Sequence, residues 1–244
     1  MELRMLSLFS GVGGMERGAE NAGIQTIGQV ELGEFQRKVL SKHWPEVPKW
    51  GEIQDVGERE LSSIYPIDVV AGGFPCQDIS NAGKRAGISG TRSGLWSEMV
   101  RTIRLVRPKY AVVENVAALL VRGMETVLGD LAESGYDAEW DCLPAVAFGA
   151  SHRRDRTFIV AYPEREGLER EGISNVFPTY HAWKPVQFRG LSESDIVRRR
   201  NDVPNYMDRI VSMGNAVVPP VAAWVFKQVV EHERTKGGTP DERT

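Results

Sequence analysis

The sequence predicts an α/β protein with a mostly parallel sheet and helices on both of its faces. Short apolar runs alternate with stretches of helical periodicity from residue 3 to residue 161, the order that produces strand–helix–strand units. A glycine-rich turn follows the first apolar run, and two later runs end at an acidic residue. Ligands of such sheets bind beyond the carboxyl ends of the strands. Functional residues are therefore expected at these run ends.

The elements follow in order along the chain. Strands are predicted at residues 3–9, 27–30, 67–71, 110–113, 138–143 and 157–161. Helices are predicted at residues 15–22, 35–43, 95–106, 122–134 and 221–232. Gly23 ends the first helix, and Trp44-Pro45 breaks the second. Residues 162–208 are rich in proline, glycine and mixed charges, so we expect a small irregular region there. Residues 1–161 and 209–244 then form the main domain.

Composition limits the class of protein. The chain is 41% hydrophobic and 26% charged, with a net charge of −3, as in soluble globular proteins. No apolar run approaches the roughly 20 residues that span a bilayer, and the N-terminus lacks a secretory signal. Two cysteines form no disulfide framework and no zinc spacing. We expect a reduced, monomeric, cytoplasmic protein that holds no metal and contacts no membrane.

Charge is uneven along the chain. Residues 84–109 contain seven cations and one anion, a net charge of +6. A basic segment at this place suits a polyanionic substrate such as nucleic acid. The alternative is a solvated helix face.

Cys76 is the candidate nucleophile. It lies in Gly72-Gly73-Phe74-Pro75-Cys76-Gln77, just past a predicted strand, and a thiolate there can attack a substrate bound at the sheet edge. Pro75 stiffens the preceding backbone.

Acidic and basic side chains are predicted at the same edge. Glu31 ends the second strand, where a carboxylate can accept two ribose hydroxyls, and the preceding glycine turn suits a nucleotide or nucleoside. Glu114 ends another strand, where burial raises the pKa of a carboxyl so that it can donate a proton. Strand alternation puts Arg154 and Arg156 on one face, toward carboxylates or an anionic substrate.

Five motifs in this order resemble those of bacterial and phage cytosine-5 DNA methyltransferases. They are Phe9-Ser10-Gly11-x-Gly13-Gly14, Gly73-Phe74-Pro75-Cys76-Gln77, Glu114-Asn115-Val116, Arg154-x-Arg156 and Gly214-Asn215-Ala216-Val217. The resemblance implies a Rossmann-like methyltransferase fold, S-adenosylmethionine as cofactor, duplex DNA as substrate and a separate cognate restriction endonuclease. Residues 162–208 are then the target-recognition region. That region is short for the family, Glu52 replaces its usual Asp, and His152 replaces its usual Gln.

The resemblance also implies residue roles. Cys76 adds to C6 of a flipped-out cytosine, and Glu114 hydrogen-bonds or protonates N3 and holds the exocyclic amine. Arg156 binds the base oxygen and helps to orient Glu114, and Arg154 supports it. The implied cofactor contacts are Phe9, Ser10, Gly11, Gly13, Glu31, Glu52, Ile53, Pro75, Asn215 and Val217. The implied substrate contacts are Gln77, Ser80, Lys84, Arg85, Arg92, Tyr180, Trp183, Arg198 and Arg199.

Three rival functions remain open at this point. An RNA cytosine-5 methyltransferase would use the same flipped-base chemistry. A non-catalytic DNA-binding relative would not need Cys76, Glu114 and Arg156 together. An NAD-dependent oxidoreductase would need a different glycine spacing after the first strand.

Overall fold

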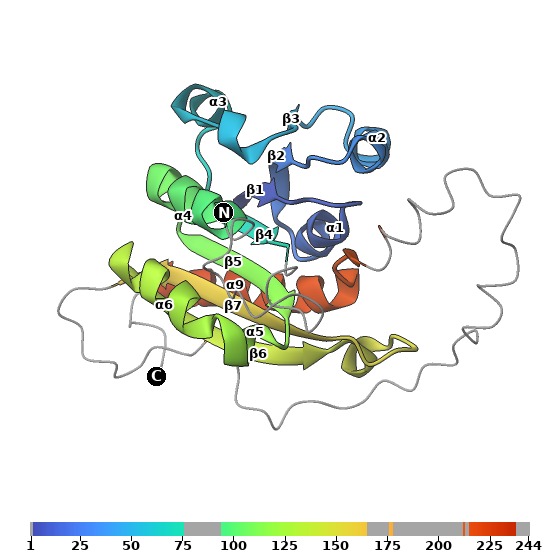
Figure 1. Ribbon diagram of the computed structural model, residues 1–244, viewed down its shortest axis with the longest axis vertical. Coiled ribbons are helices and arrows are strands. Elements are labelled where there is room, and N and C mark those ends of the chain that lie inside the picture. Colours follow the sequence, from blue (N-terminus) through green and yellow to red (C-terminus); the bar gives the residue numbers. More distant parts are fainter. Residues whose placement is uncertain (1, 76–93, 165–175, 178–211, 213–214, 238–244) are drawn as a thin grey trace, which may run out of the picture.

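A computed structural model describes residues 2–75, 94–164, 176–177, 212 and 215–237. Its seven-stranded sheet has the strand order β3-β2-β1-β4-β5-β7-β6 (Figure 1). The first five strands of this order pair in parallel, whereas β7 pairs antiparallel with both β5 and β6. The strands are β1 (Arg4–Leu8), β2 (Gln25–Val30), β3 (Lys49–Trp50), β4 (Val69–Gly73), β5 (Tyr110–Val116), β6 (Tyr136–Pro144) and β7 (Asp155–Pro163).

Helices cover both faces of the sheet, as predicted. Their bounds are α1 (Gly14–Asn21), α2 (Glu34–His43), α3 (Glu58–Ser63), α4 (Gly94–Val106), α5 (Leu119–Arg122), α6 (Met124–Glu133) and α9 (Pro219–Gly237). Short 3-10 turns occur at η1 (Ile53–Asp55) and η3 (Ala145–Phe148). None of the described helices is both long and apolar enough to cross a membrane.

Strand alternation produces two cores. Leu6, Val70 and Val113 point to one face, where they pack with side chains of α3, α4 and α6. Met5, Ala71 and Val112 point to the other face and pack with α1 and α9. Because successive strand residues face opposite sides, one apolar run supplies both cores. This is why the strands read as continuous apolar runs.

Two differences from the sequence-based expectation affect the site. β5 continues to Val116, so Glu114 lies inside a strand and pairs with Phe158 of β7. Glu114 and Asn115 end the apolar run in the sequence, but the pairing of β5 with β7 continues through them to Val116. In addition, Val176 and Phe177 lie within the region predicted to be irregular. They are 2% and 9% exposed and belong to the core beside α9.

Candidate active site

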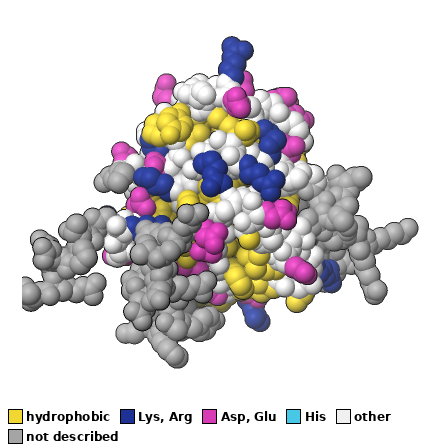
Figure 2. All heavy atoms as spheres, turned by 90° about the vertical axis from the view of Figure 1, so that its left-hand side faces the viewer, with side chains coloured by type: hydrophobic (Ala, Val, Ile, Leu, Met, Phe, Trp, Pro, Cys, Tyr) yellow, Lys and Arg dark blue, Asp and Glu magenta, His cyan; other side chains and the backbone are white. Residues whose placement is uncertain are grey.

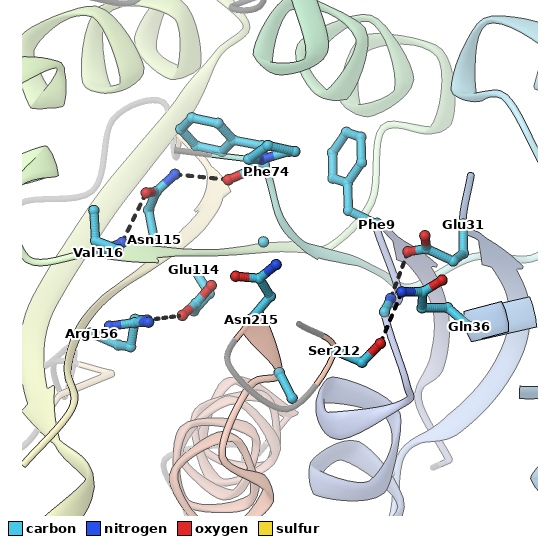
Figure 3. A pocket seen from close by; sticks show the side chains of 14 residues that line it. Phe9, Glu31, Gln36, Phe74, Glu114, Asn115, Val116, Arg156, Ser212 and Asn215 are labelled. Atoms are coloured by element: carbon cyan, nitrogen blue, oxygen red, sulfur yellow. Dashed lines mark hydrogen bonds and ion pairs between the residues drawn. The ribbon is translucent and has the colours of Figure 1, made fainter. Parts of the chain in front are cut away.

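One cavity of about 280 Å³ opens at the carboxyl ends of the parallel strands, where ligands bind in open α/β sheets. Its walls come from the loops after β1 and β2, from α2, from the ends of β4 and β5, from the start of β7 and from the segment before α9 (Figure 3). The lining residues are Phe9, Gly11, Glu31, Gln36, Gly73, Phe74, Pro75, Glu114, Asn115, Val116, Arg156, Ser212, Asn215 and Ala216.

Glu31 forms the acidic wall of the cavity. Its carboxylate accepts hydrogen bonds from the backbone N–H of Gly11 at 2.7 Å and of Gly33 at 2.8 Å. These donors lie in the loops after β1 and β2, so the carboxylate is held at the point where both strands end. Phe9, the residue after β1, also faces the cavity (Figure 3). Its φ of 55° is unusual for a residue with a side chain and is typical of functional sites.

Glu114 and Arg156 form a buried ion pair at the other end of the cavity. Arg156 Nε lies 3.0 Å from Glu114 Oε1, and the two side chains are 21% and 9% exposed. Burial raises the pKa of Glu114 from 4.5 to about 6, although the charges of Arg156 and Arg154 lower it. Desolvation therefore outweighs the ion pair. The sequence-based prediction of a raised pKa at Glu114 is confirmed.

The chain that leads to Cys76 starts beside this ion pair. Gly73 pairs with Glu114 across β4 and β5, and a Cβ at Gly73 would lie 2.6 Å from Glu114 Oε2. Only glycine leaves this space for the carboxylate. Asn115, which is 2% exposed, donates from Nδ2 to the Phe74 carbonyl at 3.1 Å. The backbone two residues before Cys76 is therefore fixed next to Glu114.

Arg154 lines the same small cavity as Arg156, so the two arginines lie together, toward a carboxylate, as the sequence predicts. Arg154 precedes β7 and has a φ of 34°, in the left-handed region. Its Nη2 donates to the Ala216 carbonyl at 2.8 Å, so it joins the start of β7 to the segment before α9. Its charge still acts on Glu114.

The remaining predicted cofactor residues are dispersed. Pro75 and Asn215 line the main cavity, whereas Gly13 and Val217 line a second cavity of about 240 Å³ on the other side of the glycine turn. Ser10 is buried and donates to Ser7 Oγ at 3.0 Å. Ile53 is 3% exposed in the core, and Glu52 beside it is exposed.

Ten predicted site residues lie outside the described part of the chain. They are the nucleophile Cys76 and the substrate contacts Gln77, Ser80, Lys84, Arg85, Arg92, Tyr180, Trp183, Arg198 and Arg199. Their roles stay predictions. Among the described residues, no cluster of His, Cys, Asp or Glu has the composition of a metal site.

The described half of the basic segment serves internal contacts rather than a substrate. Arg101 donates to the carbonyls of Ile53 and Val56, at 2.9 and 3.0 Å. Arg104 Nε donates to Ser134 Oγ, and Arg107 to the Ser134 carbonyl. Lys109 pairs with Asp68 and Glu233. On the face that Figure 2 shows, Lys and Arg are interspersed with Asp and Glu rather than gathered in one patch.

Gln36 and Ser212 line the cavity and were not predicted. Gln36 Nε2 donates to Ser212 Oγ at 2.9 Å, although the residues are 176 positions apart. A polar residue in an amphipathic helix gives no local sign of such a partner. Phe74, Asn115, Val116 and Ala216 also line the cavity. They lie within the motifs shared with cytosine-5 DNA methyltransferases, but the sequence predicted no cofactor or substrate contact for them.

The chemistry of the cavity suits a nucleoside with a positive charge. Glu31 can accept two ribose hydroxyls, and Phe9 offers an aromatic face to a base. The charged side chains among the described lining residues are Glu31, Glu114 and Arg156, and Arg156 is already paired. A sulfonium group finds favourable charge in such a cavity. The pyrophosphate of a dinucleotide would need a cation, and the cation among the described lining residues, Arg156, already pairs with Glu114.

Comparisons with known proteins agree with this chemistry. Residues 3–206 match the family model described as C-5 cytosine-specific DNA methylase. The chain is 32% identical to the Type II methyltransferase M.Eco47II of Escherichia coli over 90% of this chain and 54% of the relative. It is 36% identical to M2.BsuMI of Bacillus subtilis (strain 168), over 65% of this chain and 42% of the relative. The chain thus spans about half the length of these relatives.

A solved structure supports the fold. The Entamoeba histolytica methyltransferase EhMeth superposes with a TM-score of 0.59 at 19% identity. The match covers 69% of this chain and 55% of that chain.

Proposed function

We propose that this chain, which belongs to the C-5 cytosine-specific DNA methylase family, methylates C5 of cytosine in duplex DNA. One observation supports this most strongly. The buried Glu114–Arg156 pair and Glu31 open into a single cavity next to the backbone that leads to Cys76. A proton donor and a ribose-binding carboxylate thus lie on either side of one space.

The proposed mechanism starts with the nucleophile. The Cys76 thiolate forms a bond to C6 of a cytosine that has left the helix stack. The electron pair displaced from the ring needs a proton at N3, and Glu114, with its pKa raised to about 6, supplies it. Arg156 holds the Glu114 carboxylate through its Nε, and its guanidinium also binds the base oxygen. C5 then carries the electron density that an electrophile needs.

S-adenosylmethionine supplies a methyl group on a positively charged sulfur when bound. Glu31 holds the ribose, and Phe9 packs on the adenine. Asn215 closes the cavity from the C-terminal side. After C5 is methylated, a base removes the C5 proton, the C6–sulfur bond breaks, and Cys76 leaves as a thiolate, while N3 returns its proton to the Glu114 carboxylate. The product is 5-methylcytosine.

The rival functions differ in what they require. The intact set of Cys76, Glu114 and Arg156 argues against a non-catalytic relative. The acidic cavity argues against an NAD-dependent enzyme, because its pyrophosphate needs donors or positive charge. The description of the matched family model, C-5 cytosine-specific DNA methylase, supports DNA over RNA as substrate.

Labelled S-adenosylmethionine distinguishes the substrates directly. The full chain is incubated with duplex DNA or with transfer RNA, and the label in each nucleic acid is counted. We expect the label in DNA, and nuclease digestion should recover it as 5-methylcytosine. Label confined to transfer RNA would establish the RNA enzyme instead, and heat on titration with NAD would restore the oxidoreductase.

The remaining assignments belong to this same proposal. Residues 1–161 and 209–244 form the catalytic domain, and residues 162–208 read the DNA. The protein acts as a monomer in the cytoplasm of a bacterium or a phage-infected cell. A cognate restriction endonuclease acts separately on the same site.

Glu31→Ala is expected to weaken S-adenosylmethionine binding by about 1.5–3 kcal/mol, the range for hydrogen bonds to a charged acceptor. The loss has two sources, because Glu31 also orients the loops at Gly11 and Gly33. Calorimetric titration measures it. Glu34→Ala removes an exposed acid paired with Lys38 on α2 and is the matched control, with unchanged affinity. Equal affinity of Glu31→Ala and wild type would remove Glu31 from the site.

Neutralising Arg198, Arg199 and Arg200 together is expected to weaken DNA binding and flatten its salt dependence. Each lost phosphate contact lowers the slope of log affinity against log salt by about 0.9. The methylated sequence should not change, because phosphate contacts do not read bases. Variants at Tyr180, His181 or Trp183 should alter that sequence instead. Bisulfite sequencing of a methylated plasmid library distinguishes the two kinds of contact. If the arginine variant changed the methylated sequence and the aromatic variants did not, the roles of the two groups would be the reverse of those proposed.

A further inference from the structure

A hydrogen bond between two distant segments closes one side of the main cavity. Gln36 of α2 donates from Nε2 to Oγ of Ser212 at 2.9 Å. Both residues line the cavity, and Ser212 is 6% exposed. Figure 3 shows the two side chains meeting between Glu31 and Asn215. The bond therefore joins the wall that carries Glu31 to the wall that carries Asn215.

The Gln36 side chain is held beside the Glu31 carboxylate. A Cβ at Gly33 would lie 2.0 Å from Gln36 Oε1 and 3.1 Å from Glu31 Oε1. The absence of a side chain at Gly33 is therefore what lets the Gln36 amide occupy this place. The Gly33 N–H also donates to Glu31 Oε1 at 2.8 Å. The turn at Gly33 thus positions both the Glu31 carboxylate and the Gln36 amide that donates to Ser212.

The opposite wall is attached at two described points. Ser212 precedes Asn215 by three residues, and Ala216 follows it. Ser212 Oγ accepts the hydrogen bond from Gln36, and the Ala216 carbonyl accepts one from Arg154 Nη2 at 2.8 Å. The first bond fixes this wall to α2, and the second fixes it to the start of β7. Asn215 lies between these two attachments.

We propose that Gln36 and Ser212 are positioning residues that retain the cofactor. Their hydrogen bond holds the Asn215 wall against the Glu31 wall. A cofactor enclosed between them leaves when the walls separate, and the bond opposes that separation. The inference rests on the proposed function, because it assumes S-adenosylmethionine in this cavity. Neither residue is required to touch the reacting atoms.

A double-mutant cycle tests the pair. S-adenosylmethionine affinity is measured by calorimetry, and dissociation by stopped flow, for Gln36→Met, Ser212→Ala and the double variant. Each single variant should bind about fivefold more weakly, the effect of one neutral hydrogen bond, mainly through faster dissociation. The double variant should be no weaker than either single variant. Ser212→Thr keeps the hydroxyl and should restore wild-type affinity. Gln25→Met, an exposed glutamine at the amino end of β2, is the matched control.

Several results would overturn this inference. If the double variant bound S-adenosylmethionine about 25-fold more weakly, the two single losses of affinity would multiply, and the residues would make two independent contacts. An effect of Gln36→Met with none of Ser212→Ala would make Gln36 a direct cofactor ligand. Lower unfolding temperatures of the cofactor-free single variants, in proportion to their affinity loss, would make the pair a general fold contact. Wild-type protein that binds no S-adenosylmethionine would instead refute the proposed function, which keeps the two failures distinct.

Discussion

Cys76→Ser is expected to abolish methyl transfer and to leave cofactor binding intact. A serine hydroxyl stays protonated at neutral pH, so it cannot add to C6 as a thiolate does. The variant should bind S-adenosylmethionine with wild-type affinity in calorimetry. Its incorporation of labelled methyl groups into duplex DNA should fall below detection.

Cys142 provides the control for this substitution. It lies on β6, is half-buried, and burial raises the pKa of its thiol, which disfavours the reactive thiolate. Cys142→Ser should therefore keep its activity. Near-normal turnover by Cys76→Ser would show that Cys76 is not the nucleophile. An inactive Cys142→Ser would mean either that Cys142 is the nucleophile or that it fills a core position that serine cannot.

Glu114→Gln is expected to lower kcat/KM for DNA by about 10²–10⁴-fold, the usual contribution of a positioned general acid. Glutamine keeps the shape of the side chain and its hydrogen bonds but has no acidic proton. It also leaves the buried Arg156 without its carboxylate partner. Glu125→Gln changes an acid in the first turn of α6 and should be fully active. A loss smaller than tenfold in Glu114→Gln would remove the acid role.

The pH profile gives a second test of Glu114. The active form needs a protonated Glu114, which is lost as pH rises through its pKa of about 6. It also needs the Cys76 thiolate, which increases with pH up to about 8.5. The two trends cancel between these values, so the kcat/KM of the wild type should rise below pH 6 and then level off. Glu114→Gln lacks the first titration, and its residual activity should keep rising from pH 6 to pH 8.

Local patterns in the sequence predict most of the fold. Apolar runs located β1, β2, β4 and β5, and Trp44-Pro45 correctly ended α2 at His43. The two-residue β3 and the short α3 carry too little periodicity to be recognised. The order that puts β7 between β5 and β6 depends on long-range pairing, which no local pattern contains.

The site shows the same division between local and distant information. Glu31 and Glu114 were found because an acid at the end of an apolar run is conspicuous. The end of β5 was missed for the same reason, since a polar residue inside a strand looks like its end. Charge counting could not tell that Arg101 and Lys109 have internal partners. The Gln36–Ser212 bond depends on chain folding alone.

The central claim is that Cys76 bonds to a cytosine held beside Glu114. Duplex DNA with 5-fluorocytosine at the target position tests it directly, because fluorine cannot leave C5 as a proton does. With S-adenosylmethionine present, we expect a covalent protein–DNA complex that survives denaturation. Mass spectrometry of the digested complex should place the nucleotide on the peptide that contains Cys76. Absence of a complex on DNA that the protein methylates, or a nucleotide on any other residue, would contradict the account.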